Sequence, residues 1–251
     1  MDRHQNAIRS DFDLLNRSKS LSFLSPVELR ELTSSLRSAN FSSGEIILSE
    51  AALGTGVHFL LKGIAKITCL NRSDRRVTVG LLAPGPIPEF LSSLISRWHF
   101  RCEAYSDCRV GRISWDHFDV IAKAASQSAL RTFHQNNLMQ WYQWSLGFLG
   151  LDTRERLVFM LRQLCSNFGV VESRGTLLPF PLRHKDLADL VGATRPRVTE
   201  HLAELEREHL LIRQGRQLIV RLDRIEKPTV APMPDRNGSF TNAGPPSHFP
   251  K

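Results

Sequence analysis

The sequence predicts an α+β protein with an N-terminal antiparallel β-roll of the jelly-roll type, a long helix and a C-terminal winged helix-turn-helix. Three observations predict this order. Short β-rich runs separated by turn residues fill residues 41–113, a long helical pattern follows, and two helical segments split by Gly192 precede a hairpin. We therefore expect a helix and β-roll at 1–115, a long helix at 116–150, a winged helix-turn-helix at 151–225 and a disordered tail at 226–251.

Composition sets the broad class. The chain has 251 residues, of which 41% are hydrophobic and 23% charged, enough for a sizeable core in two domains. Lys and Arg number 33 against 25 Asp and Glu, so the formal net charge is +8. That balance favours a polyanionic partner such as nucleic acid.

Cysteine usage and hydropathy exclude several other classes. The four cysteines contain no C-x-x-C pair, so neither a zinc knuckle nor an iron–sulfur loop is predicted, and a reducing cytosol is the expected setting. The first twenty residues hold no signal-peptide core. No apolar run reaches the roughly 18 residues of a membrane span.

The N-terminal helix and the β-rich segment carry local signals. Residues 1–40 are predicted to be helical, with Ser25, Pro26 and Glu28 as cap, first-turn proline and capping-box acid. The strands then expected are Ile46–Leu48, Val57–Leu61, Ile64–Thr68, Val77–Leu82 and Val110–Ile113. Many short strands at regular spacing predict a small antiparallel roll.

The helical pattern at 116–149 has two apolar stripes. One stripe contains Leu130, Asn137, Trp141, Trp144 and Phe148. The other, which includes Met139 and Tyr142, lies about 140° away at 100° per residue. Burial inside one domain is one interpretation, but we favour a homodimer in which the first stripe faces a second subunit.

The C-terminal part contains a helix at 152–168 capped by Asp152 and Glu155, a strand at 177–182, helices at 185–191 and 196–209, and a hairpin at 211–220. Leu187, Ala188, Val198, Leu202 and Leu205 should seat the two short helices. Gly192 permits the sharp turn between them.

The start of the second short helix carries the strongest functional signal. We expect Thr194 to cap it through the Arg197 amide, Pro196 to occupy the first turn, and Arg195, Arg197, Glu200 and His201 to point outward. Arginine is the best reader of guanine in the major groove. A generic helical hairpin is the alternative, but the following hairpin, with two arginines around Gly215, suits a wing on phosphates. The predicted DNA-binding residues are Thr194, Arg195, Pro196, Arg197, Thr199, Glu200, His201, Arg213 and Arg216.

These residues resemble the CRP/FNR superfamily of bacterial transcription regulators, over roughly Leu21 to Ile225. The C-terminal match rests on Leu187-Ala188, Gly192, Arg195, Val198, Leu202 and the hairpin; the N-terminal match includes Gly44-Glu45, Gly63, Gly85 and Glu89. The resemblance implies a β-roll sensor, a dimer helix and a winged helix-turn-helix. Its implied partners are double-stranded DNA, a second copy of the chain and RNA polymerase, in the bacterial cytoplasm at the nucleoid, with no membrane.

The ligand pocket departs from the family pattern. Cyclic-nucleotide binders of the family use a Phe-Gly-Glu-Leu run and an Arg-Ser/Thr pair, whereas this chain has Ile87-Pro88-Glu89-Phe90 and Trp98-His99 there. Proline lacks the amide that a phosphate nest needs. Cyclic nucleotide is therefore disfavoured, no cysteine cluster for an iron–sulfur group precedes Cys69, and the effector is unknown. The candidate pocket residues are Ile87, Glu89, Phe90, Arg97 and Arg101.

Two further functions stay open at this point. One is a DNA-binding regulator that needs no effector, which the Pro88 and Trp98 departures favour. The other is a β-roll enzyme or ligand-storage protein with a structural helical module. The sequence shows no nucleophile–base pair or phosphate loop, so we predict no catalytic residues, no metal site and no enzyme activity.

Overall fold

The computed structural model describes residues 10–16, 21–49, 55–70, 73–87, 100–124 and 150–221. Some predictions lie outside these residues and stay predictions. They are the dimer stripe Leu130, Asn137, Trp141, Trp144 and Phe148, the pocket residues Glu89, Phe90 and Arg97, and the tail at 226–251.

The N-terminal part begins with a helical turn at residues 10–16, followed by two longer helices that flank a series of short strands. These elements are α2 (Pro26–Ser35), β1 (Arg37–Phe41), β2 (Ile46–Leu48), β3 (Val57–Lys62), β4 (Ala65–Leu70), β5 (Arg76–Leu82), β6 (Gly85–Pro86), β7 (Phe100–Ala104), β8 (Cys108–Ile113) and α4 (Trp115–Ala124). The Ser25 capping box at the start of α2 is confirmed. The helical prediction for 37–40 is wrong, because these residues form β1 and pair with β8.

The strands form two antiparallel four-stranded sheets, in the orders β1-β8-β3-β6 and β2-β7-β4-β5. Alternate side chains point between the sheets, which confirms the predicted roll. The buried interior contains Ile47, Leu48, Leu60, Ala65, Ile67, Cys69, Ile87, Cys102, Ala104, Cys108 and Val110. A second core lies where α2 and α4 pack on the first sheet, around Leu32, Phe59 and Phe118.

The C-terminal domain combines three helices with a four-stranded antiparallel sheet of order β11-β12-β10-β9. Its elements are α6 (Thr153–Phe168), β9 (Val170–Glu172), β10 (Gly175–Leu178), α7 (His184–Leu190), α8 (Arg195–Arg207), β11 (Leu211–Gln214) and β12 (Gln217–Val220). The Asp152 capping box of α6 is confirmed. The strand predicted at 177–182 is shorter, since β10 ends at Leu178 and the chain then runs along the roll into α7.

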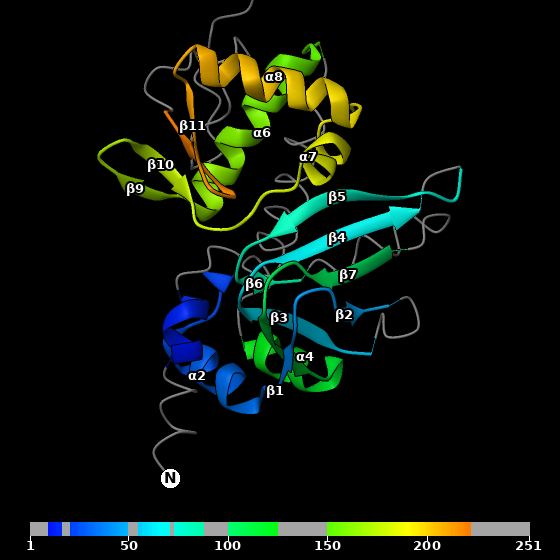
Figure 1. The fold of residues 1–251 in the computed structure, drawn as a ribbon. Coiled ribbons are helices and arrows are strands. Elements are labelled where there is room, and N and C mark those ends of the chain that lie inside the picture. Colours follow the sequence, from blue (N-terminus) through cyan, green and yellow to red (C-terminus); the bar gives the residue numbers. More distant parts are fainter. Residues whose placement is uncertain are drawn as a thin grey trace, which may run out of the picture.

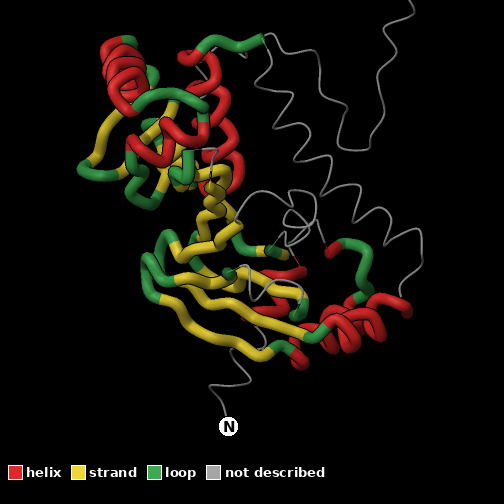
Figure 2. The backbone as a smooth tube through the Cα atoms, turned by 90° about the vertical axis from the view of Figure 1, so that its right-hand side faces the viewer, coloured by secondary structure: helices red, strands yellow, loops and turns green. Residues whose placement is uncertain are grey.

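The two domains are stacked (Figures 1 and 2), with α7 lying over β4 and β5 of the second sheet (Figure 1). Leu81 of β5 and Tyr105, which follows β7, belong to the buried core of the C-terminal domain. The domains therefore share apolar packing as well as polar contacts. Each helix among the described residues is too short or too polar to span a lipid bilayer.

Candidate nucleic-acid interface

Helices α7 and α8 form a hairpin whose inner faces are apolar. Leu187, Ala188, Val198, Leu202 and Leu205 are at most 3% exposed and belong to one core, as predicted. Gly192, in the turn, has φ of +62°, a left-handed conformation that glycine adopts without strain. The core thus fixes α8 against α7 and leaves the opposite face of α8 in solvent.

The first turn of α8 is exposed and arginine-rich. Arg195, Pro196 and Arg197 are all exposed, and Pro196 occupies the first turn. The predicted cap is wrong: Thr194 is the N-cap residue, but its side chain makes no capping hydrogen bond. Proline at the second helical position removes one of the two amides that a capping oxygen normally reaches, and the Thr194 side chain is exposed. The amide groups at this helix start remain open to an anion.

Arg197 and Glu200 form an ion pair across the exposed face of α8. Arg197 Nη1 lies 2.8 Å from Glu200 Oε2, and the two side chains are 54% and 55% exposed. An exposed pair of this kind contributes about 0 to 1 kcal/mol, so it can exchange for a stronger contact. Both side chains can therefore turn toward a ligand without a large loss of stability.

His201 is not part of this surface, and the prediction that it points outward is wrong. Its side chain is 6% exposed, and Nδ1 lies 2.8 Å from Glu204 Oε2. Val198 and Leu205, three residues before and four after, are core residues on the same helix face. That spacing is the signal in the sequence from which a buried His201 could have been predicted.

The wing is the hairpin of β11 and β12, closed by Gly215 and Arg216. Gly215 has φ of +61°, which this tight turn requires. Arg216 is exposed at the tip, whereas Arg213 is held against α8 by Glu206, with Nε 2.7 Å from Oε1. Both predicted wing arginines are exposed, but Arg213 also pairs with Glu206 and so ties the wing to α8.

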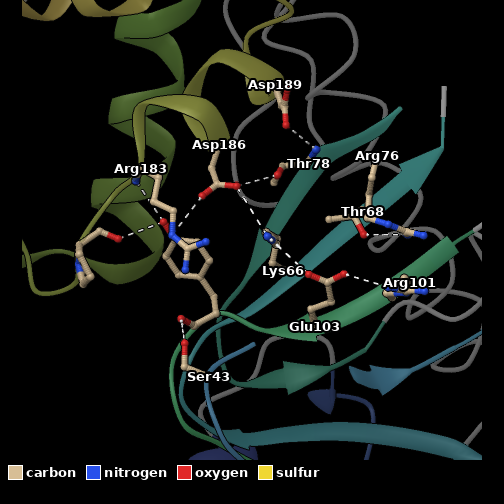
Figure 3. A network of polar contacts seen from close by, with 12 residues as sticks. Ser43, Lys66, Thr68, Arg76, Thr78, Arg101, Glu103, Arg183, Asp186 and Asp189 are labelled. Carbon is tan, nitrogen blue, oxygen red and sulfur yellow. Dashed lines mark hydrogen bonds and ion pairs between the residues drawn. The ribbon is translucent and has the colours of Figure 1, made fainter. Parts of the chain in front are cut away.

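The other side of α7 is fastened to the β-roll by two buried carboxylates (Figure 3). Asp186 is 3% exposed, and its Oδ1 accepts a 2.8 Å hydrogen bond from the Thr78 hydroxyl and lies 3.7 Å from Lys66 Nζ. Asp189 Oδ2 accepts a 3.1 Å hydrogen bond from the Thr78 backbone N–H. Because β5 is an edge strand, Asp189 satisfies an amide that no neighbouring strand reaches.

Lys66 of the β-roll forms ion pairs within its own domain and with the DNA-binding domain. Its Nζ lies 3.5 Å from Glu103 on the neighbouring strand β7 and 3.7 Å from Asp186 on α7, and its side chain is 14% exposed. A cation between two carboxylates offsets the cost of burying either of them. Sequence reasoning assigned no role to Thr78, Lys66, Asp186 or Asp189, although two acids three residues apart on an otherwise buried helix suggest an interface.

Tyr105 adds a second connection. Its hydroxyl donates to the Pro181 carbonyl at 3.0 Å and accepts from the Arg183 backbone N–H at 3.2 Å. The Arg183 guanidinium lies 5.4 Å from the centre of the tyrosine ring. Burial is the main cause that raises the pKa of Tyr105 to about 12, so the hydroxyl keeps its proton and its donor role. The segment leading into α7 is thereby fixed to the roll.

The two predicted pocket residues that the structure describes, Ile87 and Arg101, do not face a common space. Ile87 is buried in the roll interior. Arg101 is not: Cys102 and Ala104 point inward on β7, so Arg101 lies on the outer face, 3.7 Å from Glu103. The prediction that Arg101 lines an interior pocket is therefore wrong. The described residues contain no group of three His, Cys, Asp or Glu side chains arranged to hold a metal ion.

Comparisons with known proteins agree with this architecture. A cyclic nucleotide-binding domain model matches residues 39–124, and a Crp-like helix-turn-helix domain model matches residues 155–227. The nitrogen fixation regulation protein FixK of Bradyrhizobium diazoefficiens is 26% identical over 194 residues, covering 74% of this chain and 78% of that protein. The global nitrogen regulator of Synechococcus elongatus is 24% identical over 190 residues, covering 74% and 86%.

Solved structures show the same fold. FixK2 from Bradyrhizobium japonicum superposes with a TM-score of 0.62 at 19% identity, covering 74% of this chain and 92% of that one. The c-di-GMP responsive global regulator CLP of Xanthomonas campestris superposes with a TM-score of 0.60 at 16% identity, covering 78% and 99%.

A β-roll stacked on a helix-turn-helix whose second helix begins with an exposed, arginine-rich turn defines a DNA-binding regulator with a sensor-type domain. Together, the two domain matches show that the chain belongs to the CRP/FNR superfamily of transcription regulators. The alternative of an enzyme has no support from these matches, since the matched proteins are transcription regulators.

Proposed function

We propose that this regulator recognises DNA through the first turn of α8 in the major groove, with the β11–β12 wing on the adjacent phosphates. The observation that carries the proposal is the joint exposure of Arg195, Arg197 and Arg216 beside an uncapped helix start. Amide groups and arginines at one helix end attract the phosphate backbone and can reach base edges. Thr194 and Thr199 stay candidates at the border of this surface.

Three side chains set the proposed sequence preference. Arg195 contacts a guanine through O6 and N7, Pro196 offers only apolar contact to a thymine methyl group, and Glu200 accepts from cytosine N4. Where family members commonly carry Arg, Glu and Arg, this chain carries Arg195, Pro196 and Glu200. The half-site should therefore keep one guanine and differ from the usual family half-site elsewhere. Arg197, released from Glu200, clamps a phosphate.

The β-roll is proposed to control where the DNA-binding domain lies. Support comes from the buried contacts between Thr78, Lys66 and Asp186, because any shift of β4 or β5 moves the atoms that hold α7. An effector bound to the roll would act through these contacts. Its identity is unassigned, and cyclic nucleotide is disfavoured by Pro88 and by Trp98-His99.

The working form is proposed to be a homodimer on the stripe that contains Trp141 and Trp144, with Asn137 fixing the register. Two-fold symmetry then predicts a palindromic site with half-sites about 34 Å apart. RNA polymerase is the proposed protein partner and the bacterial nucleoid the proposed location, both from the family membership. An effector-independent regulator is the second candidate, favoured by the same departures in the pocket sequence.

Binding-site selection on random duplexes tests the proposal. It should return a palindrome with one retained guanine per half-site.

Two variants test the roles of the arginines. Arg195→Ala should cost about 1 to 3 kcal/mol of binding free energy at the selected site and relax selection at one base pair. Arg197→Ala should weaken binding to all sequences alike and reduce the salt slope by roughly one unit. Arg207→Ala, at the far end of the same helix, is the matched control and should leave selectivity unchanged. An unaltered family half-site, or full selectivity in Arg195→Ala, contradicts the assignment.

A further inference from the structure

His184 lies where α7, α8 and the wing meet. It is the first residue of α7, and its ring touches both other elements. Nδ1 lies 2.9 Å from Thr199 Oγ1 on α8, and Nε2 lies 3.4 Å from Arg213 Nη1 on β11. Thr199 borders the proposed DNA-binding surface and Arg213 ties the wing to α8, whereas sequence reasoning gave His184 no role.

The hydrogen-bond partners fix the proton on one ring nitrogen. The Thr199 hydroxyl donates its single hydrogen to the Arg195 carbonyl at 2.9 Å, so toward the ring the Thr199 oxygen can only accept. His184 Nδ1 must therefore carry hydrogen and donate. A guanidinium can only donate, so Nε2 must be the bare acceptor that faces Arg213. One neutral tautomer satisfies both contacts, and the doubly protonated ring cannot accept from Arg213.

The surrounding charges favour that neutral ring. The charged groups that face it are Arg195 and Glu206 on α8 and Arg213 on β11. Burial is the largest cause that lowers the pKa of His184 from its usual 6.5, and Arg213 and Arg195 lower it further, while Glu206 acts in the opposite direction. The ring thus stays neutral at pH 7.

We infer that His184 is a positioning residue for DNA recognition: its neutral ring links the recognition helix α8 to the wing, so that both meet DNA as one rigid unit. Arg213 is then held at two points, by His184 Nε2 and by the ion pair with Glu206. Protonation of the His184 ring removes the contact between Nε2 and Arg213, and it places a positively charged imidazole next to the Arg213 guanidinium. The inference rests on the proposed function, since it takes α8 and the wing as the DNA-contacting elements.

Acidification has two effects that must be separated. Every histidine that gains a proton adds positive charge, which raises affinity for any duplex. Loss of the contact between His184 and Arg213 instead loosens the position of the wing relative to α8, which should lower the preference for the selected duplex. The informative quantity is therefore the ratio of affinities for a selected duplex and a scrambled duplex of equal length. The ratio of the two affinities should have its highest value above about pH 6.5. It should fall as the pH drops through the lowered pKa of His184.

The experiment uses the full-length chain and three variants. His184→Gln keeps a donor and an acceptor but cannot be protonated, and His184→Ala keeps neither. His117→Gln, at an exposed histidine on α4 of the β-roll domain, is the matched control. Affinity ratios are measured by fluorescence anisotropy from pH 7.5 to 5.5, and long-range ¹H–¹⁵N NMR spectra report the tautomer of His184 in the free protein.

The inference predicts a proton on Nδ1 at pH 7 and a roughly tenfold lower ratio for His184→Ala, the scale of one lost hydrogen bond. His184→Gln should keep the ratio and lose its pH dependence, while His117→Gln should behave as wild type. A proton on Nε2, or an unchanged ratio in His184→Ala, overturns the inference while the proposed function stands. A wild-type protein that binds both duplexes equally at every pH overturns the proposed function and this inference with it.

Discussion

The hydroxyl of Thr78 on the β-roll donates a 2.8 Å hydrogen bond to Asp186 of the DNA-binding domain, across 108 positions of sequence. The same residue donates its backbone N–H to Asp189, so one threonine donates hydrogen bonds to two carboxylates of α7. Both carboxylate side chains are nearly inaccessible to water, at 4% and 5% exposure. A buried carboxylate that loses its donor is costly, so removal of the Thr78 hydroxyl should weaken the packed interface.

Thr78→Val should loosen the interface. The substitution keeps the shape of the side chain and removes the donor to Asp186, at a cost of about 1 to 3 kcal/mol. Hydrogen exchange should become faster at residues 184–190 while the core of the roll is unaffected. Thr68→Val is the control, since Thr68 lies opposite Thr78 in the same sheet but only accepts a 3.4 Å contact from Arg76. Equal exchange at α7 in both variants contradicts the role of Thr78.

Gly63→Ala should destabilise the roll far more than Gly44→Ala. Both glycines have φ near +90°, so both substitutions carry the conformational cost of about 1 to 2 kcal/mol. A Cβ at Gly63 would lie 2.2 Å from the Asp107 carbonyl oxygen, whereas at Gly44 nothing lies within 4 Å. The backbone must move at Gly63, which adds about 1 to 3 kcal/mol. Urea unfolding followed by circular dichroism measures the difference, and equal losses would refute the steric argument.

Asp152 should make the stability of the C-terminal domain depend on pH. Its carboxylate accepts a 2.9 Å hydrogen bond from the Glu155 amide, which lowers the pKa of Asp152 below its usual 3.8. A lowered pKa means stability that is present above pH 3.8 and is lost as the pH falls through the folded-state pKa. Asp152→Ala should cost about 0.5 to 2 kcal/mol at pH 7. Asp152→Asn should cost less, and its deficit relative to the wild type should shrink as the pH falls below 3.8, in urea titrations at pH 7 and at successively lower pH values.

Replacing Trp141 and Trp144 by Ala should give monomers. Both lie on the stripe predicted to face a second subunit, where buried tryptophan supplies large contact area. Sedimentation velocity measures the oligomeric state. Tyr142→Ala, on the other stripe, is the control and should lower stability without changing the mass. A wild-type protein that sediments as a monomer at micromolar concentration ends the dimer proposal.

Cyclic AMP should bind weakly or not at all. The position of the phosphate-binding glycine carries Pro88, and the expected Arg-Ser/Thr pair is Trp98-His99. Arg101, one substitute considered from the sequence, lies on the outer face of the sheet beside Glu103. Isothermal titration calorimetry should therefore give no saturable heat up to about 1 mM cyclic AMP. A micromolar Kd that is lost in Arg97→Ala would show that the pocket is intact.

Local signals in the sequence predicted much of the fold. The capping boxes at Ser25 and Asp152 were predicted because their partners lie three residues away. The helix-turn-helix was predicted because Leu187, Val198 and Leu202 repeat with the helical period on either side of Gly192. These patterns need only one or two turns of chain, so the sequence by itself determined the capping boxes, the family resemblance and the arginine-rich start of α8. It missed strands β1 and β7, whose pairing partners lie far away in the sequence.

Tertiary structure decided which polar groups meet. The sequence around Thr78 does not indicate that Asp186 will accept a hydrogen bond from its hydroxyl. The sequence around His184 does not indicate that Arg213 will face its ring. Arg101 and Cys102 are neighbours on one strand, and their side chains point to opposite faces of the sheet. The packing of the two sheets against each other decided which of these faces became the interior. Short-range periodicity assigns a side chain to a face of its own element. The partner on that face is set by how distant elements pack, because hydrogen bonds and ion pairs form only within a few ångströms.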